Sequence, residues 1–229
     1  MLYVVGTPIG NLKDITLRAV EILLDVPVIL CEDTRKTYQL LLKYQKPGKN
    51  LPRLISFYEE NENQRIPEVI SLLKSGTEIA LVSNSGTPTI SDPGFKLIRQ
   101  CWDEGIKVIP IPGPSSCIAA LSCSGLPTDK FLFLGFLPKK EGEKKRLLEN
   151  IKKSFDFILP TVIFFESPFR LIKTLKLIKD VFGDITLVIC REITKIYEET
   201  KREKVSFFLE EYAKNEPKGE LVILFNPKV

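Results

Sequence analysis

The sequence contains no histidine among its 229 residues. This absence excludes catalysis by Ser–His–Asp or Cys–His groups, and it removes the commonest protein ligand of metal ions. No apolar run is long enough to span a bilayer, and the first residues, Met1–Val5, are typical of a strand rather than of a signal peptide. We therefore expect a cytoplasmic protein whose chemistry depends on carboxylates, lysines, arginines, main-chain groups or a bound cofactor.

Cysteine is sparse, and its spacing excludes the usual cysteine sites. The five cysteines form no C-x-x-C pair, and most of them lie in apolar surroundings. This pattern indicates buried thiols in a reducing compartment and predicts neither disulfides nor a zinc site. The residues concerned are Cys31, Cys101, Cys117, Cys123 and Cys190.

The sequence also lacks the two common phosphate-binding motifs. Neither G-x-x-x-x-G-K-[ST] nor G-x-G-x-x-G occurs. A P-loop enzyme and a dinucleotide-binding Rossmann enzyme are therefore unsupported, and a generic nucleotide-binding enzyme is the least favoured interpretation.

Positive charge is in excess only in the second half of the chain. Residues 1–112 carry 13 basic and 13 acidic residues, whereas residues 113–229 carry 20 and 16. The densest basic cluster is Pro138–Lys153, with seven basic and three acidic residues. It is either a solvated helix face or a surface that contacts RNA phosphates, which Lys36 and Lys43 could extend. The candidates for RNA contact are Lys139, Lys140, Lys144, Lys145 and Arg146.

Strand-like and helix-like runs alternate along the chain, which is typical of an α/β protein with largely parallel sheets. In the first half we expect strands at 2–6, 27–31, 53–57, 78–82 and 107–111, with helices at 16–24, 35–44, 64–75 and 95–104. In the second half we expect helices at 115–124 and 168–182, with strands at 131–136, 160–166, 185–190, 204–207 and 220–226. The segment Ile111-Pro-Gly-Pro114 is the natural boundary, so the sequence predicts two α/β domains, 1–112 and 113–229.

Three loops rich in glycine, proline, serine and threonine follow strands of the first half. Because the C-terminal ends of parallel strands share one edge of a sheet, these loops should meet where open α/β sheets bind ligands. Glycine lets a ligand approach the main chain closely, and proline holds the loop shape. The sequence thus predicts a small-molecule site, but the spacing of these loops does not identify the ligand. The loops are Gly6–Leu12, Ser83–Gly94 and Pro112–Ser116.

These segments resemble the tetrapyrrole methylase superfamily, in the branch that methylates a ribose 2′-hydroxyl of small-subunit ribosomal RNA. The resemblance covers essentially the whole chain in order. In the first half it rests on GTPIGNL with Asp14-Ile-Thr16, on Cys31-Glu-Asp-Thr-Arg35, on Ser85–Gly94 and on Pro112–Ser116. In the second half it rests on Glu166-Ser167 with Arg170, on Arg191–Lys195 and on Lys218-Gly-Glu220.

The resemblance implies an enzyme that uses S-adenosylmethionine, and no metal, to methylate the 2′-hydroxyl of a cytidine in 16S rRNA of the small ribosomal subunit. It also implies a homodimer, and two α/β domains with mixed, largely parallel sheets and the cofactor in the cleft between them. Asn84 departs from the family, which usually has Asp there, so any role that needs a carboxylate at this position is lost. By position, the cofactor-binding residues are Pro8, Ser85, Gly86, Pro88, Ile90, Ser91, Ser115, Ser116, Phe165, Glu166 and Gly219.

Methyl transfer to a ribose hydroxyl needs alignment of donor and acceptor, and a nearby carboxylate or lysine can help to remove the hydroxyl proton. Two charged segments follow strands at the predicted site, and the sequence does not decide which residue is the base. The alternative to a catalytic role for Asp33 is that it stabilises the N-terminus of a helix. For the segment Arg191–Lys195, the alternative is an exposed network of ion pairs. The catalytic candidates are Glu32, Asp33, Arg35, Arg191, Glu192 and Lys195.

Two rival functions remain open from the sequence. The first is carbon methylation of a corrin or porphyrin precursor, which is also polyanionic, so net charge does not discriminate. The second is a non-catalytic RNA-binding protein of ribosome assembly, against which the intact loops argue. The segments Cys31–Arg35 and Lys218–Glu220 favour the RNA methyltransferase.

Overall fold

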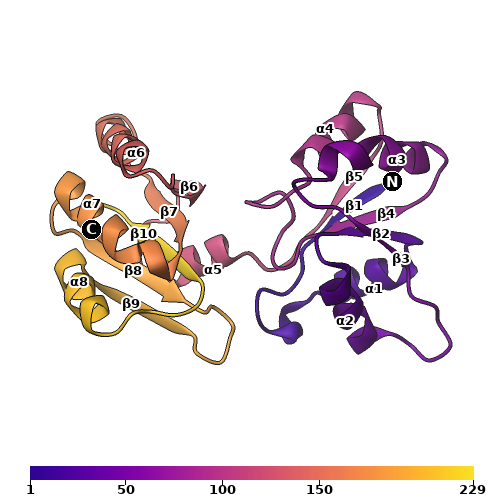
Figure 1. The fold of residues 1–229 in the computed structure, drawn as a ribbon, viewed down its shortest axis with the longest axis horizontal. Coiled ribbons are helices and arrows are strands. Elements are labelled where there is room, and N and C mark those ends of the chain that lie inside the picture. The colour runs from indigo at the N-terminus through magenta and orange to yellow at the C-terminus, as the bar shows by residue number, and fades with distance from the viewer. The chain divides into compact units, whose positions relative to one another are not determined.

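The computed structural model describes residues 1–229, which divide into two compact units, Met1–Ser115 and Ser116–Val229 (Figure 1). The division falls three residues beyond the boundary expected at 112. The functions assigned to the two halves stay predictions. No helix of the chain combines the length and the apolar character needed to cross a membrane.

The first unit is a parallel five-stranded sheet in the order β3-β2-β4-β1-β5, as its sequence pattern predicts. Its strands are β1 Leu2–Val5, β2 Val28–Cys31, β3 Arg53–Ser56, β4 Ile79–Val82 and β5 Val108–Ile111. Its helices are α1 Leu17–Asp25, α2 Thr34–Tyr44, α3 Glu62–Lys74 and α4 Phe95–Asp103, with a short 3-10 turn η1 at Leu12–Asp14.

Alternation along the strands gives this sheet two apolar faces. In β2, Leu30 packs with α3 and α4, whereas Ile29 and Cys31 pack with α1 and α2. Figure 1 shows the two helix pairs on opposite sides of the sheet. Because both faces are covered, the sheet exposes only its edges to ligands. The C-terminal edge is the one that carries the three small-residue loops.

The second unit is a mixed five-stranded sheet in the order β6-β7-β10-β8-β9. Its strands are β6 Phe131–Phe136, β7 Thr161–Glu166, β8 Thr186–Arg191, β9 Glu199–Lys204 and β10 Leu221–Phe225. Its helices are α5 Ser116–Cys123, α6 Glu141–Ser154, α7 Pro168–Phe182 and α8 Val205–Lys214.

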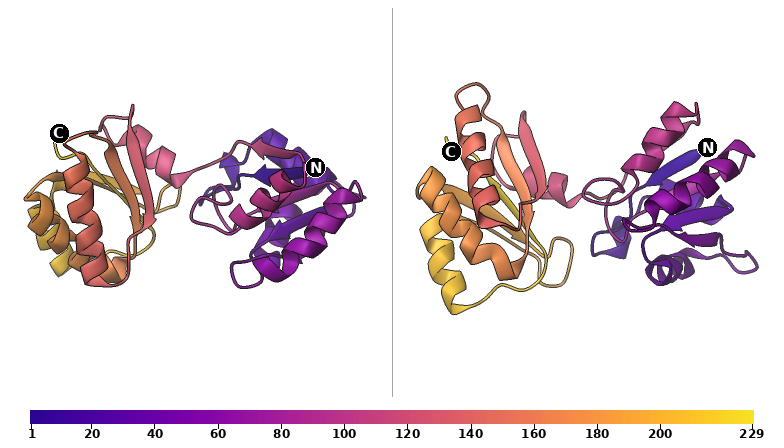
Figure 2. Two further views of the ribbon diagram at one scale, coloured as in Figure 1. Left: turned by 90° about the horizontal axis from the view of Figure 1, so that it is seen from above. Right: turned by 45° about the horizontal axis from the view of Figure 1, so that its top comes forward.

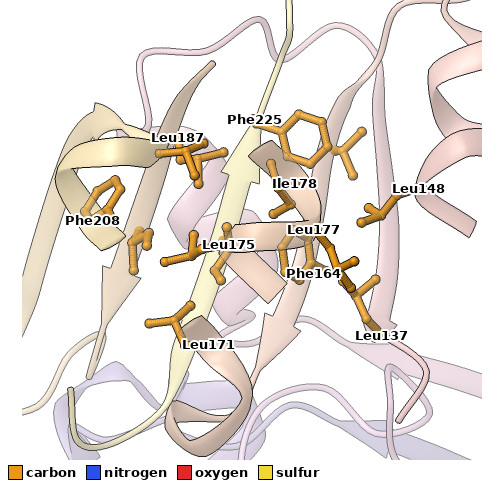
Figure 3. Close-up of a cluster of buried hydrophobic side chains, with 14 of the residues drawn as sticks. Leu137, Leu148, Phe164, Leu171, Leu175, Leu177, Ile178, Leu187, Phe208 and Phe225 are labelled. Atoms are coloured by element: carbon orange, nitrogen blue, oxygen red, sulfur yellow. The ribbon is translucent and has the colours of Figure 1, made fainter. Parts of the chain in front are cut away.

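The main core of the second unit lies between its sheet and α6, α7 and α8, which share one side of the sheet (Figure 2). Phe164 and Phe225 from the strands meet Leu175 and Ile178 of α7 there, and Leu148 of α6 joins them (Figure 3). Helix α5 covers the opposite face through Cys117, Ala120 and Leu121.

Two expectations for the second half were wrong in detail. The sheet is largely antiparallel, because β10 runs against both neighbours and β9 runs against β8, and only the β6–β7 pair is parallel. The strand expected at 204–207 is the start of α8, and the strand precedes it as β9. The sequence of β9 is Glu-Thr-Lys-Arg-Glu-Lys. Because this exposed edge strand is made of charged and polar residues, it shows no alternation of apolar residues from which a strand could be predicted.

Candidate active site

The three small-residue loops of the first unit meet at the C-terminal edge of the sheet, as predicted. Thr7 and Gly86 exchange two main-chain hydrogen bonds, with N···O distances of 2.8 and 3.0 Å. The Thr87 hydroxyl donates to the carbonyl of Pro114 at 3.2 Å. These contacts tie the loop after β4 to the loops after β1 and β5, so the three act as one wall.

Glycine is required where two of these loops cross. A Cβ atom added to Gly6 would lie 2.8 Å from the Cα atom of Gly113, and one added to Gly113 would lie 2.8 Å from the carbonyl oxygen of Gly6. Since real Cβ atoms do not approach main chain this closely, any side chain here would push the loops apart. Both glycines are therefore needed for the close crossing of the loops that forms the wall, rather than for contact with a ligand.

The loop Ser83–Gly94 holds strained main chain. Thr89 and Ser91 have φ angles of 75° and 65°, in the left-handed region that side chains disfavour. The end of the loop is fixed by Glu62, a buried carboxylate that accepts a hydrogen bond from the Gly94 amide at 3.1 Å. Strain that is retained by such anchors concentrates at functional sites.

This wall fits a cofactor bound against main chain. Gly86 adopts φ 82°, and a Cβ atom there would meet only the Ile9 and Pro114 atoms at 3.4 and 3.8 Å, so the space beside it is nearly free. Ile90 is 46% exposed although its side chain is apolar, as expected for a surface that a ligand covers. The predicted cofactor residues that the first unit brings to this edge are Pro8, Ser85, Gly86, Pro88, Ile90, Ser91 and Ser115.

A carboxylate lies beside this wall at the end of β2. Glu32 Oε2 accepts a hydrogen bond from the Asn84 amide at 2.6 Å, while Oε1 is buried and has no hydrogen-bond partner. Burial raises the pKa of Glu32, and the Asn84 hydrogen bond and the nearby charge of Lys36 oppose that rise. Asn84 thus takes the place of a second carboxylate and holds Glu32 in one orientation.

Sequence reasoning missed Asp92, which lies in the same loop. Burial, followed by the neighbouring charge of Glu32, raises the pKa of Asp92 to about 6, although a hydrogen bond from Ser83 opposes this rise. A carboxyl group shifted toward neutral pH by its surroundings is typical of functional sites. Asp92 is the only charged residue in Ser83–Gly94, and that signal could have singled it out.

We expect Asp92 to make the stability of the protein depend on pH. Its pKa is about 6 in the folded chain and 3.8 without that environment, so between about pH 4 and 6 the folded state binds more protons than the unfolded state, and stability falls as the pH rises. Asp92→Asn should therefore stabilise the protein at pH 7.5 by about 1–2 kcal/mol, allowing for partial screening by solvent, and should not stabilise it at pH 4.

Urea unfolding at the two pH values measures this difference. Asp103→Asn, at an exposed position on the next helix, is the matched control and should change stability little at either pH. A gain from Asp92→Asn that is equal at pH 4 and pH 7.5 would contradict the assignment.

Asp33 and Arg35 are bound to each other. The Asp33 side chain caps α2 by accepting from the Arg35 amide at 2.9 Å, and it pairs with the Arg35 guanidinium at 3.0 Å. These bonds lower the pKa of Asp33 to about 2. A carboxylate with so low a pKa is a weak base, so the geometry favours Glu32 over Asp33 for proton removal.

A pocket of about 560 Å³ lies beside this pair, within the first unit. The loop after β1, helix α2 and the start of the loop after β4 form its walls. Its lining residues are Thr7, Pro8, Leu12, Asp33, Arg35, Lys36, Thr37, Gln39, Leu40, Lys43, Ser83 and Asn84.

The second unit brings its charged candidates together at the ends of β8 and β10. Lys195 contacts Glu192 at 2.9 Å and Glu220 at 3.1 Å, and Glu192 also accepts from the Glu220 amide. Burial lowers the pKa of Lys195, but the hydrogen bonds and charges of Glu192 and Glu220 together outweigh this effect, so the pKa of Lys195 is raised. The hydrogen bond from the Glu220 amide makes the largest contribution to lowering the pKa of Glu192. The hydrogen bond from the Lys195 side chain lowers this pKa further.

Glycine is favoured beside this group, because Gly219 has φ 93°, a conformation that side chains disfavour. A Cβ atom on Gly219 would lie 2.5 Å from the Glu192 carboxyl carbon. Glu192 itself has φ 51°, which is strained for a residue with a side chain. Arg191 forms its ion pair with Glu199, at 3.3 Å, rather than with this group. The geometry therefore joins Glu192, Lys195 and Gly219, and separates Arg191 from them.

Two predicted site residues lie in the interior of the second unit. The Glu166 carboxylate accepts from Lys144 at 3.3 Å and from the Thr174 hydroxyl at 2.5 Å, and it pairs with Arg170. The side chains of Lys144 and Glu166 are 4% and 0% exposed. The expectation that Lys144 contacts RNA phosphates was wrong, because its ammonium group is buried against this carboxylate.

The other basic residues of Pro138–Lys153 remain on the surface. Lys139, Lys140, Lys145 and Arg146 are exposed, and Lys140 pairs with Glu143 at 3.1 Å. Lys144 occupies the inner face of α6, together with Leu148 and Ile151. Among the remaining cofactor candidates, Ser116 begins α5 and Phe165 lies in β7, both half-buried.

The five cysteines form no disulfide, as predicted, and four of them are buried. Burial raises the pKa of Cys101 and of Cys117 to about 11. Such thiols are protonated at neutral pH and are poor nucleophiles. Cys101 and Cys117 are therefore poorly suited to nucleophilic catalysis.

Comparison with known proteins gives the family of the chain. The family of tetrapyrrole (corrin/porphyrin) methylases matches residues 1–207, and the chain belongs to this family. It is therefore a methyltransferase, and its methyl donor is S-adenosylmethionine, as the family resemblance implies.

Similarity to particular proteins is high over the full length. The ribosomal RNA small subunit methyltransferase I of Thermotoga maritima is 46% identical over 229 residues, which are 99% of this chain and 98% of that protein. The protein of the same name from Hydrogenobaculum sp. is 46% identical over 226 residues, 98% of this chain and 95% of that protein.

Solved structures share the fold at much lower identity. A cobalt precorrin-4 methyltransferase matches with a TM-score of 0.68 at 19% identity, over 97% of this chain and 93% of that one. A diphthine synthase matches with a TM-score of 0.71 at 14% identity, over 98% and 89%. The expected α/β fold class is confirmed.

Proposed function

We propose that this protein transfers a methyl group from S-adenosylmethionine to the 2′-hydroxyl of a cytidine in 16S rRNA of the small ribosomal subunit. The observation that carries the proposal is the 46% identity, over 99% of the chain, to a ribosomal RNA small subunit methyltransferase I. Methylation of a corrin or porphyrin precursor is the second candidate, supported by the family match.

When bound, S-adenosylmethionine would supply a methyl group attached to its sulfonium sulfur. The ribose oxygen would form the new bond to the methyl carbon as the carbon–sulfur bond breaks, and S-adenosylhomocysteine would leave as the neutral thioether. The chain's task is to align the two partners and to receive the hydroxyl proton. We assign the alignment to the wall formed by the three loops, with Gly86 at its centre. We assign proton acceptance to Glu32, whose orientation Asn84 fixes. Asp92 supports this role because it can exchange a proton close to neutral pH.

The remaining site residues keep auxiliary functions in this proposal. Arg35 holds Asp33 at the start of α2, and the group of Glu192, Lys195 and Gly219 lies near main chain that the family resemblance gives to the cofactor. The exposed residues Lys139, Lys140, Lys145 and Arg146 are proposed to contact RNA phosphates.

The decisive experiment follows a labelled methyl group. We expect the protein to label undermethylated small subunits, and the label should be found on a ribose 2′-oxygen after digestion to nucleosides. Free ribosomal RNA and a porphyrin precursor serve as parallel acceptors. Labelling of the porphyrin precursor alone would replace the proposal with the second candidate.

We further propose that the protein works as a homodimer in the cytoplasm, as the family resemblance implies. Sedimentation equilibrium tests the dimer directly. A mass of 26.0 kDa at micromolar protein, the mass of one chain, would contradict it.

A further inference from the structure

We propose that the pocket along α2 holds one nucleotide of a single-stranded RNA segment, with Lys36 and Lys43 as its phosphate-binding residues. This inference rests on the proposed function, because it names the part of the same site that receives the acceptor. It goes beyond the RNA surface expected on Pro138–Lys153 of the other unit, which Lys36 and Lys43 were expected only to extend, because it assigns these two lysines to a nucleotide pocket of their own.

The pocket has an appropriate size and an appropriate wall for a nucleotide. Its volume of about 560 Å³ is within the range of small-molecule sites. Leu12, Leu40 and Pro8 supply apolar surface, against which a base or ribose can pack. The loop that carries Leu12 is held against α2, because the Tyr44 hydroxyl donates to the Leu12 carbonyl at 2.8 Å.

The charge of the pocket is positive once internal pairs are removed. Asp33 and Arg35 neutralise each other. Lys36 and Lys43 are exposed and form no ion pair, and they are seven residues apart on α2, so they occupy the same face about 10 Å apart. Two unpaired ammonium groups on either side of an apolar floor match the phosphates that flank one nucleotide.

The pocket also points the ribose toward the reacting groups. Ser83 and Asn84 line it, and they begin the loop assigned to the cofactor. Asn84 donates to Glu32, so the proposed proton acceptor lies next to this end of the pocket. A nucleotide held by the lysines of α2 would therefore bring its sugar to the cofactor wall. Only an unpaired, accessible nucleotide can enter, since stacked bases in a duplex cannot reach a concave site.

The test removes both charges by the double substitution Lys36→Ala and Lys43→Ala. The matched control, Lys74→Ala with Lys107→Ala, removes the same charge from the same unit at the opposite edge of the sheet, at the last residue of α3 and at the residue before β5. Methyl transfer to undermethylated small subunits is measured at several salt concentrations, and S-adenosylmethionine affinity is measured by calorimetry.

We expect the α2 variant to raise the KM for small subunits at least tenfold while its S-adenosylmethionine affinity stays within twofold of wild type. The slope of log affinity for RNA against log salt should fall by about 0.7–0.9 for each lost phosphate contact. Ultraviolet crosslinking of bound RNA should label a peptide within 33–44 in wild type and lose that label in the variant.

Each alternative outcome is distinct. If wild type methylates RNA and the α2 variant matches the control in KM, salt slope and crosslinking, the nucleotide pocket is wrong and the proposed function stands. If wild type binds S-adenosylmethionine but labels only the porphyrin precursor, the proposed function and the RNA pocket both fail.

Discussion

Lys144→Ala should lower the free energy of unfolding of the second unit by about 3 kcal/mol, although Lys144 belongs to a segment that looks like a solvated basic helix. Its ammonium group is buried between Glu166 and Thr174. Removing one partner of a buried ion pair typically costs about 3–5 kcal/mol, because the other charge stays in the interior without compensation. We expect the lower end of this range, since Arg170 still pairs with Glu166.

Urea unfolding followed by far-UV circular dichroism measures the loss. Lys145→Ala, one residue further along α6 and exposed, is the matched control and should change stability by less than about 0.5 kcal/mol. The only tryptophan, Trp102, lies in the first unit, so its fluorescence reports on that unit separately. Equal stability of the two variants would show that Lys144 is not a structural residue. An RNA-binding test of α6 should therefore change Lys145 and Arg146 and leave Lys144 intact.

The contrast between Lys144 and its neighbours shows where sequence reasoning succeeds. In the first unit, short apolar runs separated by amphipathic helices predict every strand and helix, because the parallel sheet is buried on both faces. In α6, charge dominates the sequence, and only the three-dimensional position of Glu166 explains why one lysine of the five basic residues of this helix points inward. Burial of a charge depends on a partner 22 residues away, which periodicity does not reveal.

In the candidate site, too, some features can be predicted from the sequence and others cannot. The three loops could be predicted to meet because their position after parallel strands fixes the edge on which they lie. Their crossing at Gly6 and Gly113 and the hydrogen bond from Asn84 to Glu32 could not, since these contacts join residues that are distant in sequence. The sequence shows Asp92 as the only charged residue of its loop, but the burial and the proximity to Glu32 that raise its pKa are visible only in the structure.

Gly86→Val should abolish measurable S-adenosylmethionine binding, a loss of at least 100-fold in affinity. Gly86 has φ 82° and exchanges two main-chain hydrogen bonds with Thr7, which join two of the three loops. A β-branched residue disfavours this φ, and its side chain would enter the nearly free space beside the wall that we assign to the cofactor. Calorimetric titration with S-adenosylmethionine measures the effect.

Gly76→Val separates a local effect at the wall from the general cost of strain. Gly76 has φ 91° and open space where a Cβ atom would be, and it lies after α3 at the opposite edge of the same sheet. Both variants place valine at a left-handed position, so both should lose comparable stability in urea. Only Gly86→Val should lose cofactor affinity. If the two variants bind S-adenosylmethionine equally well, the cofactor does not lie against Gly86; if both lose it, general destabilisation of the first unit explains the loss. Unchanged binding by Gly76→Val alongside lost binding by Gly86→Val is the result that assigns the small-residue loop to the methyl donor.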